Sequence, residues 1–306
     1  MWVRLGRGVL LAVVASVAPV LVAGCTTSSG VTSGVVDVVA AENFYGDVVE
    51  QIGGPYVHVS NVLDNPNTDP HTFESSPRIA QEVAAARLVV QNGLGYDGFM
   101  NKIESAASGN RTIVVAQHVL GLPDDTPNPH LWYSPGTMPK VAAAVAADLA
   151  SILPGHAASF RAGLEKFDRS LGPWIDAVAA FKTAHGGVPV ATTEPVADYL
   201  LTAMGAENLS PFRFQADVMN GVDPAPQDIS LVNGFFSGHQ VKVFCYNEQV
   251  VDALTTSIRR NAESAGVPVV AVYETMPAGF TYQRWMLAEV QAIDAAVSTG
   301  RSTEHL

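Results

Sequence analysis

The stretch from Val35 to Leu63, VVDVVAAENFYGDVVEQIGGPYVHVSNVL, decides the fold. It opens with a valine-rich run at 35–40, continues with a helical pattern from Asn43 to Ile52 that Gly53-Gly54 ends, and closes with an apolar run at 56–63. Strand, helix and strand in this order form a βαβ unit, in which the two strands lie parallel in one sheet. The first folded segment is therefore predicted to be of the α/β class.

The same alternation continues outward from this unit and falls into two groups. The first adds strands at 88–91 and 112–116, and the second has strands at 188–193, 241–246 and 267–273. Helical patterns lie between and after these strands, at 77–86, 98–107, 137–153, 196–204, 227–237, 249–265 and 282–297. Apolar residues spaced three and four apart predict a connecting helix between the groups, about 45 Å long. We therefore predict two lobes, each with a mostly parallel sheet flanked by helices. The predicted boundaries are 35–154 for the first lobe, 155–185 for the connecting helix, which Gly172-Pro173 interrupts, and 186–306 for the second lobe.

Composition limits the kinds of partner that this protein can have. Of 306 residues, 48% are hydrophobic and 15% are charged, which is enough apolar material for two cores. Asp and Glu number 29 against 17 Lys and Arg, and the net charge of −12 argues against nucleic acid as a ligand. Two cysteines cannot form a disulfide network, and Cys245, in an apolar run, is expected to be a small core residue.

The first 24 residues are predicted to be a signal peptide. Arg4 and Arg7 precede an apolar run, 9–23, that is shorter than the roughly 20 residues needed to span a bilayer. The following Val22-Ala23-Gly24-Cys25 resembles a bacterial lipobox, which implies cleavage before Cys25 and lipidation of its thiol. An ordinary secretory signal, in which Cys25 has no role, is the alternative. Residues 25–34 are polar and small, so we expect a flexible tether on an extracytoplasmic protein.

Four polar residues follow predicted strands, where ligands collect in open α/β sheets. They are His71, His130, Glu194 and Glu274, two from each predicted lobe. Two imidazoles and two carboxylates suit zinc or manganese, and the two negative charges would neutralise a divalent ion. Each residue also has a plain structural alternative: a hydrogen-bonded loop histidine, a helix-capping role for Glu194, or a solvated loop carboxylate for Glu274.

Three motifs resemble the metal-binding receptor lipoproteins of ABC importers for zinc and manganese. They are Thr68-Asp69-Pro70-His71-Thr72-Phe73-Glu74, Asn92-Gly93-Leu94-Gly95 and Pro129-His130-Leu131-Trp132. The resemblance covers nearly the whole mature chain. It implies two α/β lobes, one long helix between them, and a single ion bound at the lobe interface.

The resemblance also implies the ligands of that ion. The family's two histidine positions fall on His71 and His130, and Glu194 stands where zinc members carry histidine and many manganese members carry glutamate. Glu274 stands where aspartate is typical, one methylene longer. The loop at 123–128 lacks the histidines found there in some zinc members. The resemblance therefore does not decide whether the bound ion is zinc or manganese.

We therefore expect a membrane-tethered, monomeric receptor that passes its ion to an ABC permease and is not an enzyme. One alternative is a secreted metal-dependent hydrolase, although the sequence has no His-Glu-x-x-His segment and no Gly-x-Ser-x-Gly elbow. Another is an adhesin-like receptor whose metal site has decayed. The other histidines are expected to be structural or solvated.

Overall fold

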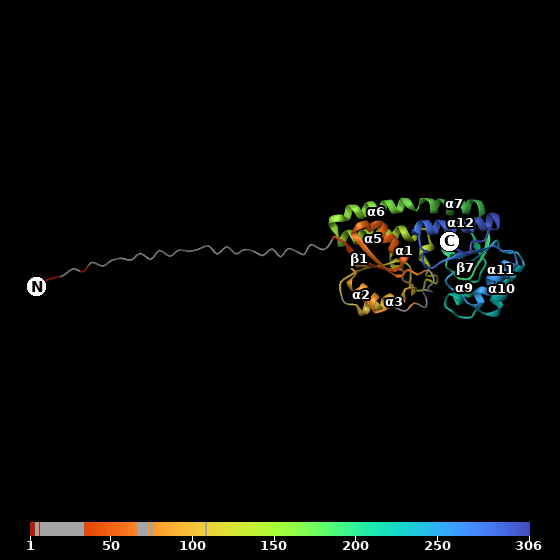
Figure 1. Cartoon of the computed structure of the whole chain (residues 1–306), viewed down its shortest axis with the longest axis horizontal. Helices are drawn as coiled ribbons and strands as arrows, with labels where there is room; N and C mark the ends of the chain where they lie inside the picture. Colours follow the sequence, from red (N-terminus) through yellow and green to blue (C-terminus); the bar gives the residue numbers. More distant parts are fainter. Residues whose placement is uncertain (4–5, 7–33, 66–72, 74–75, 108) are drawn as a thin grey trace. The chain divides into compact units, whose positions relative to one another are not determined.

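The computed structural model describes residues 1–3, 6, 34–65, 73, 76–107 and 109–306 (Figure 1). Cys25 and His71 lie outside these residues, so the lipidation site, the tether and the first histidine ligand stay predictions. Within the described part of the chain, no helix is long and apolar enough to cross a bilayer.

Two four-stranded parallel sheets confirm the predicted fold class. The first has the order β2-β1-β3-β4 and the second the order β6-β5-β7-β8. In each sheet the second strand along the chain, β2 or β6, lies at one edge, and the first strand lies next to it. The two sheets therefore have the same topology. The strands are β1 (Val36–Glu42), β2 (Val57–Leu63), β3 (Leu88–Gln91), β4 (Thr112–Val115), β5 (Pro189–Thr192), β6 (Glu207–Asn208), β7 (Val243–Asn247) and β8 (Val269–Val272).

Helices cover both faces of the sheets, as crossover connections between parallel strands require. In Figure 1, α2 and α3 lie on the opposite side of the first sheet from α1, α5 and α6. The helices are α1 (Asn43–Gly53), α2 (Pro77–Ala85), α3 (Gly98–Ala106), α4 (Ala116–Leu120), α5 (Thr137–Ile152), α6 (Ala157–Ser170), α7 (Gly172–His185), α8 (Asp198–Ala203), α9 (Phe212–Met219), α10 (Pro226–Ser237), α11 (Ala253–Ser264) and α12 (Tyr282–Thr299).

The side chains of β1 point alternately to the two faces of the first sheet, and each face carries its own apolar core. Val36, Val38 and Ala40 belong to a core that extends through both halves of the molecule, whereas Val39 and Ala41 face a smaller core. This split follows from the strand's period of two, because successive side chains point to opposite faces of a sheet. The smaller core lies under α2 and α3 and the larger core under α1 and α5.

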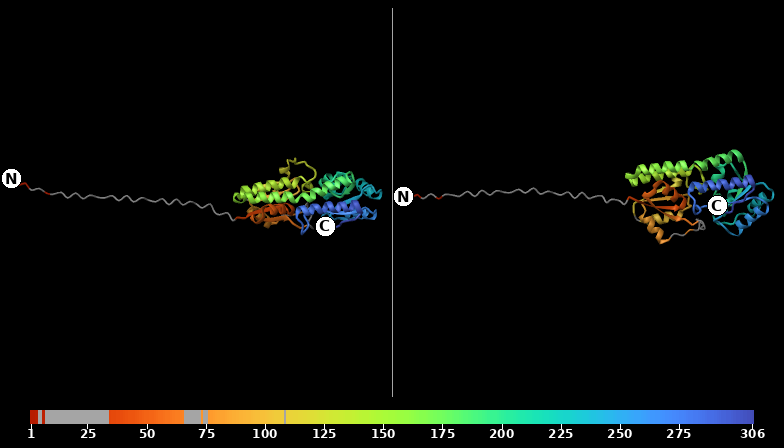
Figure 2. Two further views of the ribbon diagram at one scale, coloured as in Figure 1. Left: turned by 90° about the horizontal axis from the view of Figure 1, so that it is seen from above. Right: turned by 45° about the horizontal axis from the view of Figure 1, so that its top comes forward.

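The predicted connecting helix is present as two helices in line, α6 and α7, which run along one side of both sheets (Figure 2). Only Leu171 separates them, and its backbone keeps right-handed helical angles, φ −74° and ψ −17°. Pro173 lies in the first turn of α7, where its missing N–H would have no partner in the helix. The interruption therefore falls at the predicted Gly172-Pro173.

Among the α-helices and strands of the described residues, three were not predicted: the short helix α4, the two-residue strand β6, and α9. The start of α11 also differs from the predicted residue 249, because a capping box begins the helix at Ala253. The Asp252 carboxylate accepts from the Thr255 N–H at 2.7 Å, and the Thr255 hydroxyl accepts from the Asp252 N–H at 2.9 Å. This later start leaves residues 247–249 outside the helix.

Close packing of α6 on α1 depends on Gly163, because a β-carbon at this position would overlap the Ile52 carbonyl oxygen. We expect Gly163→Ala to lower the free energy of unfolding by about 1–3 kcal/mol in urea denaturation. Gly234→Ala is the matched control, since α10 has open space there and alanine favours helices by up to about 1 kcal/mol. Equal effects of the two substitutions would contradict the packing argument.

Candidate metal centre

Polar residues at the carboxyl ends of strands from both sheets are buried. Glu42 ends β1, Asn92 follows β3, and Asn247 ends β7. Glu194 and Glu274 come two residues after β5 and β8. Each of these side chains is at most 2% exposed. Ligand sites form at such strand ends, so the fold itself gathers polar groups there.

His130 and Glu274 bring the two halves of the chain into direct contact. The Nε2 atom of His130 lies 3.4 Å from Oε2 of Glu274, and both side chains are wholly buried. His130 comes immediately before a short 3₁₀ turn, Leu131–Tyr133, whose side chains are also buried. The position of the histidine is therefore fixed by the core around it.

Asn128 determines which ring nitrogen of His130 carries the proton. Its side-chain amide donates to the Pro195 carbonyl at 2.8 Å, which turns its Oδ1 atom toward His130. That oxygen accepts from the His130 backbone N–H at 3.0 Å and lies 2.8 Å from Nδ1 of the ring. Since an amide oxygen only accepts, Nδ1 carries the proton and Nε2 has the lone pair that a metal ion requires.

Asn247 joins the two glutamates. Its Nδ2 atom donates to Oε1 of Glu194 at 3.2 Å and to Oε1 of Glu274 at 2.6 Å. Its Oδ1 atom accepts from the Gln249 backbone N–H at 2.9 Å, which fixes the orientation of the amide. The backbone N–H of Asn247 donates to Thr193 Oγ1 at 3.0 Å, next to Glu194. One amide thus holds two carboxylates that come from different strands.

Gln249 sets the position of the Glu274 backbone. Its Oε1 atom accepts from the N–H groups of Glu274 and Thr275, at 2.5 and 2.8 Å, and its Nε2 atom donates to Thr275 Oγ1 at 2.7 Å. These bonds require Gln249 to lie in the loop after β7, which α11 leaves clear by starting at Ala253. Asn247 and Gln249 therefore organise the site through their side chains.

Three of the four predicted ligands, His130, Glu194 and Glu274, lie around Asn247 and Asn128, and His71 lies outside the described residues. Considering the described residues alone, no three His, Cys, Asp or Glu side chains are close enough to form a complete metal cluster. Neither asparagine was predicted to orient a ligand of the site. The position of Asn247 at a strand end is the same signal that identified the glutamates.

The surroundings of the site are acidic and shielded from water. Burial, with a contribution from Asp97, raises the pKa of Glu42 well above its usual range. No hydrogen-bond partner for the Glu42 carboxyl is found among the described residues. Burial also raises the pKa of Tyr96, and the charges of Glu274 and Glu42 and a hydrogen bond with Glu274 add to the shift. A cation is the kind of ligand that this concentration of carboxyl groups favours.

A second buried network lies behind the site and connects the segments that carry His130 and Glu274. The Tyr133 hydroxyl lies 2.9 Å from the Tyr273 carbonyl, accepts from the Tyr273 N–H at 3.1 Å, and lies 3.1 Å from Oε1 of Glu289. Trp285 Nε1 donates to the same carboxyl oxygen at 3.0 Å. Burial raises the pKa of Glu289 to about 8, so this carboxyl is protonated at neutral pH.

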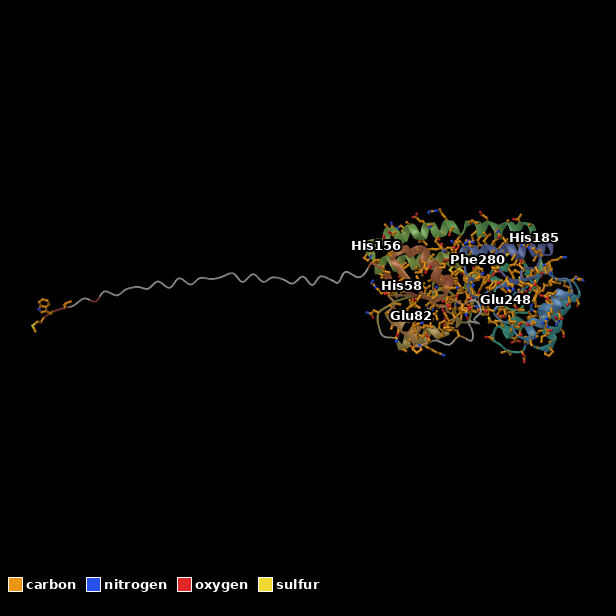
Figure 3. The ribbon with its side chains drawn as sticks, in the orientation of Figure 1. His58, Glu82, His156, His185, Glu248 and Phe280 are labelled. Atoms are coloured by element: carbon orange, nitrogen blue, oxygen red, sulfur yellow. The ribbon has the colours of Figure 1, made fainter. Side chains whose placement is uncertain are left out.

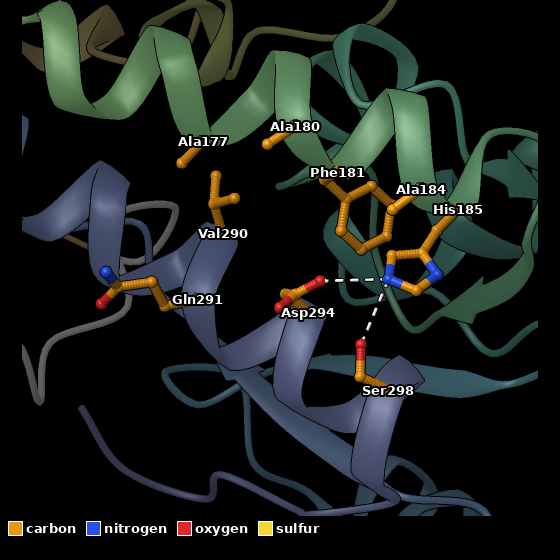
Figure 4. Close-up of a pocket in the computed structure, with 9 residues that line it drawn as sticks. All are labelled: Ala177, Ala180, Phe181, Ala184, His185, Val290, Gln291, Asp294 and Ser298. Carbon is orange, nitrogen blue, oxygen red and sulfur yellow. Dashed lines mark hydrogen bonds and ion pairs between the residues drawn. The ribbon is translucent and has the colours of Figure 1, made fainter.

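A Ser–His–Asp grouping elsewhere does not have the geometry of a catalytic triad. His185, Asp294 and Ser298 border a pocket of about 430 Å³ between α7 and α12 (Figure 4). Asp294 Oδ1 and Ser298 Oγ both approach the same ring nitrogen, Nε2, at 3.2 and 3.1 Å. A triad needs its carboxylate and hydroxyl on different ring nitrogens, so this grouping cannot relay a proton from serine to aspartate.

The other described histidines have structural or surface contacts, as expected. His156 stacks on Tyr56 with ring centroids 3.9 Å apart, and exposed His58 lies 3.4 Å from Asp37. Figure 3 shows His156 and His185 at opposite ends of the α6 and α7 pair. These residues are not gathered into a second cluster.

The raised pKa of Glu289 predicts that stability depends on pH. Its contribution is complete below about pH 4.5 and is lost as pH rises to about 8, because the unfolded chain releases the proton first. Glu289→Gln mimics the neutral carboxyl, so we expect it to remove several kcal/mol of this pH dependence, measured by urea unfolding at pH 5 and pH 8. The exposed Glu207→Gln should behave like the wild type, and a Glu289→Gln profile that parallels the wild type would refute the assignment.

Known proteins share parts of the sequence. The manganese-binding lipoprotein MntA of Bacillus subtilis (strain 168) is 25% identical over 174 residues, 53% of this chain and 55% of that protein. A putative metal-binding protein of Thermotoga maritima is 30% identical over 107 residues, 32% of this chain and 38% of that protein. The matched part of the chain spans about half the length of the first of these relatives and less of the second.

Solved structures share the fold over most of the chain. The periplasmic zinc binding protein TroA from Treponema pallidum superposes with a TM-score of 0.72 at 18% identity, covering 88% of this chain and all of that chain. An Mn-bound periplasmic metal binding protein from Candidatus Liberibacter asiaticus gives a TM-score of 0.67 at 17% identity, covering 85% of this chain and 98% of that chain. The two-sheet architecture is therefore a known one.

The family model described as zinc-uptake complex component A, periplasmic, matches residues 38–296. This range contains the candidate site, the connecting helices and both sheets except the first two residues of β1. The chain therefore belongs to the ZnuA family, that of zinc-uptake complex component A, periplasmic.

Proposed function

We propose that this protein captures one divalent transition metal ion, zinc or manganese, between its two sheets and delivers it to an ABC permease. The observation that carries the proposal is the contact of His130 with Glu274. An imidazole with its lone pair on Nε2 and a carboxylate meet at 3.4 Å in a wholly buried place, and Asn247 holds a second carboxylate beside them.

A bound cation would neutralise the two buried carboxylates, whose burial without a countercharge would destabilise the folded protein. Glu194 and Glu274 are 2% and 0% exposed, and buried carboxylates are expensive unless a countercharge lies close. We assign His71, His130, Glu194 and Glu274 as the four ligands, with His71 assigned from the sequence motif. Two nitrogens and two oxygens suit zinc, and manganese accepts the same donors.

The ion is cargo in this proposal, and the protein does no covalent chemistry. Membership of an uptake-complex family supports a permease as the partner. We propose that the receptor is a monomer, extracytoplasmic, and anchored to the membrane through lipidated Cys25. The manganese-binding relative in Bacillus subtilis is itself named a lipoprotein, in keeping with that anchor.

Removal of one ligand charge tests the proposal. We expect the mature wild-type chain to bind one ion, and Glu274→Gln to lose about 100-fold or more in affinity, because the amide keeps the shape but not the charge. Equilibrium dialysis with elemental analysis measures both. Glu248→Gln is the matched control, since Glu248 pairs with His305 at the surface, 3.3 Å away. Undiminished binding by Glu274→Gln, or no binding by the wild type, would sink the assignment.

Asn128 offers a second test that leaves all four ligands intact. We expect Asn128→Ala to weaken zinc binding about 10–100-fold, because the proton is then no longer held on Nδ1 of His130. Affinity of the wild type should also fall in acid, where protons compete for the imidazoles. Isothermal titration between pH 5 and pH 8 measures both effects, with exposed Asn110→Ala as the control. Equal affinities of the Asn128 and Asn110 variants would contradict a positioning role.

A further inference from the structure

We propose that residues 302–306 protect the outer edge of the second sheet and thereby keep this protein from pairing with a second copy of itself. These residues, here called the strap, follow α12 and lie along β8. The inference concerns a different surface from the metal centre and does not depend on the bound ion. It assigns an interaction surface, the outer side of β8, whose partner in the absence of the strap is the same surface of another copy.

Strand β8 has another strand of the second sheet on one side only. That strand is β7, and on its side the Pro268 and Val272 carbonyls accept hydrogen bonds at 3.0 and 3.1 Å. The backbone groups of Val269 and Ala271 therefore point away from β7, because successive residues of a strand turn their N–H and C=O groups to opposite sides. Such outward groups at a sheet edge are a template for pairing with another chain.

The strap binds these outward groups. The Thr303 N–H donates to the Val269 carbonyl at 2.9 Å, and the Thr303 carbonyl accepts from the Ala271 N–H at 2.8 Å. The Ser302 hydroxyl oxygen accepts from the Val269 N–H at 3.0 Å. The bridge between Val270 and Thr303 is parallel, so β8, α12 and the strap form one more strand–helix–strand unit. The strap is thus a short fifth strand of the second sheet.

Side chains near the surface align the strap. The Tyr246 hydroxyl donates to the Glu304 carbonyl at 3.2 Å, and the Glu304 carboxylate lies 3.4 Å from the Arg259 guanidinium. The His305 ring lies 3.3 Å from the Glu248 carboxylate. Exposed ion pairs of this kind contribute at most about 1 kcal/mol each. The attachment of the strap therefore depends on its backbone bonds to β8.

The edge that the strap covers is apolar. Strand β8 reads Val-Val-Ala-Val, and each of its residues is at most 3% exposed, although β8 ends the order of the sheet. An uncharged strand rich in valine has a high strand propensity and pairs readily when its edge is bare. The opposite edge, β6, has only two residues and includes the exposed Glu207, and short, charged edges resist such pairing. Strand β8 carries no charge of its own and needs a cover.

A second copy of this chain is the partner that fits the bare edge. Two copies related by a two-fold axis would place β8 beside β8 in antiparallel directions, so that Val269 and Ala271 of each copy bond to the other. Such a contact uses the same surface of both copies, so it closes at a dimer and does not extend into a filament.

Removal of the strap tests the proposal. We expect the unlipidated mature wild type to sediment as a monomer, and a chain that stops after Arg301 to shift toward twice that mass at roughly micromolar concentration and above. The matched control stops after Glu304. It keeps the backbone bonds of Thr303 and loses only the contacts of His305 and Leu306, so it should stay monomeric.

Hydrogen exchange locates the contact. The backbone amides of Val269 and Ala271 should be protected in the wild type and in the dimer of the shortened chain, and should lose protection when dilution makes the shortened chain monomeric. A dimer in which both amides exchange freely is joined elsewhere and overturns the proposal. A folded shortened chain that stays monomeric, or a wild type that dimerises equally, also overturns it.

Thr303→Pro gives a second variant, should the shortened chain fail to fold. Proline removes the N–H that bonds to the Val269 carbonyl and leaves the length of the chain unchanged. We expect the same shift in mass, whereas Thr303→Ser, which keeps the N–H, should sediment like the wild type. A monomeric Thr303→Pro chain would contradict the protective role. Zinc binding by the same variants reports separately on the proposed function.

Discussion

Two buried carboxylates, those of Glu194 and Glu274, accept hydrogen bonds from the side-chain amide of Asn247, and buried hydrogen bonds from the second half of the chain hold that amide in place. The amide contributes only a dipole, so it orients Glu194 and Glu274 without neutralising them. The strand ends of β5, β7 and β8 bring these groups within reach of one another. In the first half of the chain, His130 and Asn128 provide the complementary imidazole and its orientation.

Both halves contribute to the packing behind the site. Trp132 stacks on Phe44, with ring centroids 4.5 Å apart, and its carbonyl accepts from the Tyr282 hydroxyl at 2.6 Å. Asn43, at the start of α1, exchanges two hydrogen bonds with the backbone of Met276, at 2.8 and 2.9 Å. Met276 lies two residues after Glu274. Helix α1, at the start of the chain, therefore helps to fix the position of the Glu274 side chain, which comes from the C-terminal half.

The alternation of apolar runs with helical patterns was sufficient to predict seven of the eight strands in the described sheets, most of the helices and the interruption at Gly172-Pro173, but not the two-residue strand β6. Helix α9 was missed because Phe212–Met219 is short and follows Pro211, and its place depends on burying Phe214 and Val218. Such burial is a tertiary effect that local patterns do not contain. The extent of the lobes as separate domains stays a prediction.

Their positions after strands identified Glu194 and Glu274 as residues of the site, whereas the amides beside them were not predicted. An asparagine next to a histidine or a strand is common, and its role depends on which atoms its oxygen and nitrogen face. Asn128 and Asn247 could be assigned only once Pro195 and Gln249 were seen to fix the two amides. Glu42 follows the same strand-end rule as Glu194 and could have been found by it.

Cys245 lies in the middle of β7, wholly buried, with Thr192 as its neighbour in β5. Burial raises the pKa of its thiol far above the usual range, so the sulfur stays protonated and out of reach of solvent. Thiolates are the nucleophiles in disulfide exchange and the preferred ligands of soft cations. The thiol of Cys245 is therefore unreactive. It resists oxidation and does not compete with the residues at the strand ends for a soft cation such as copper.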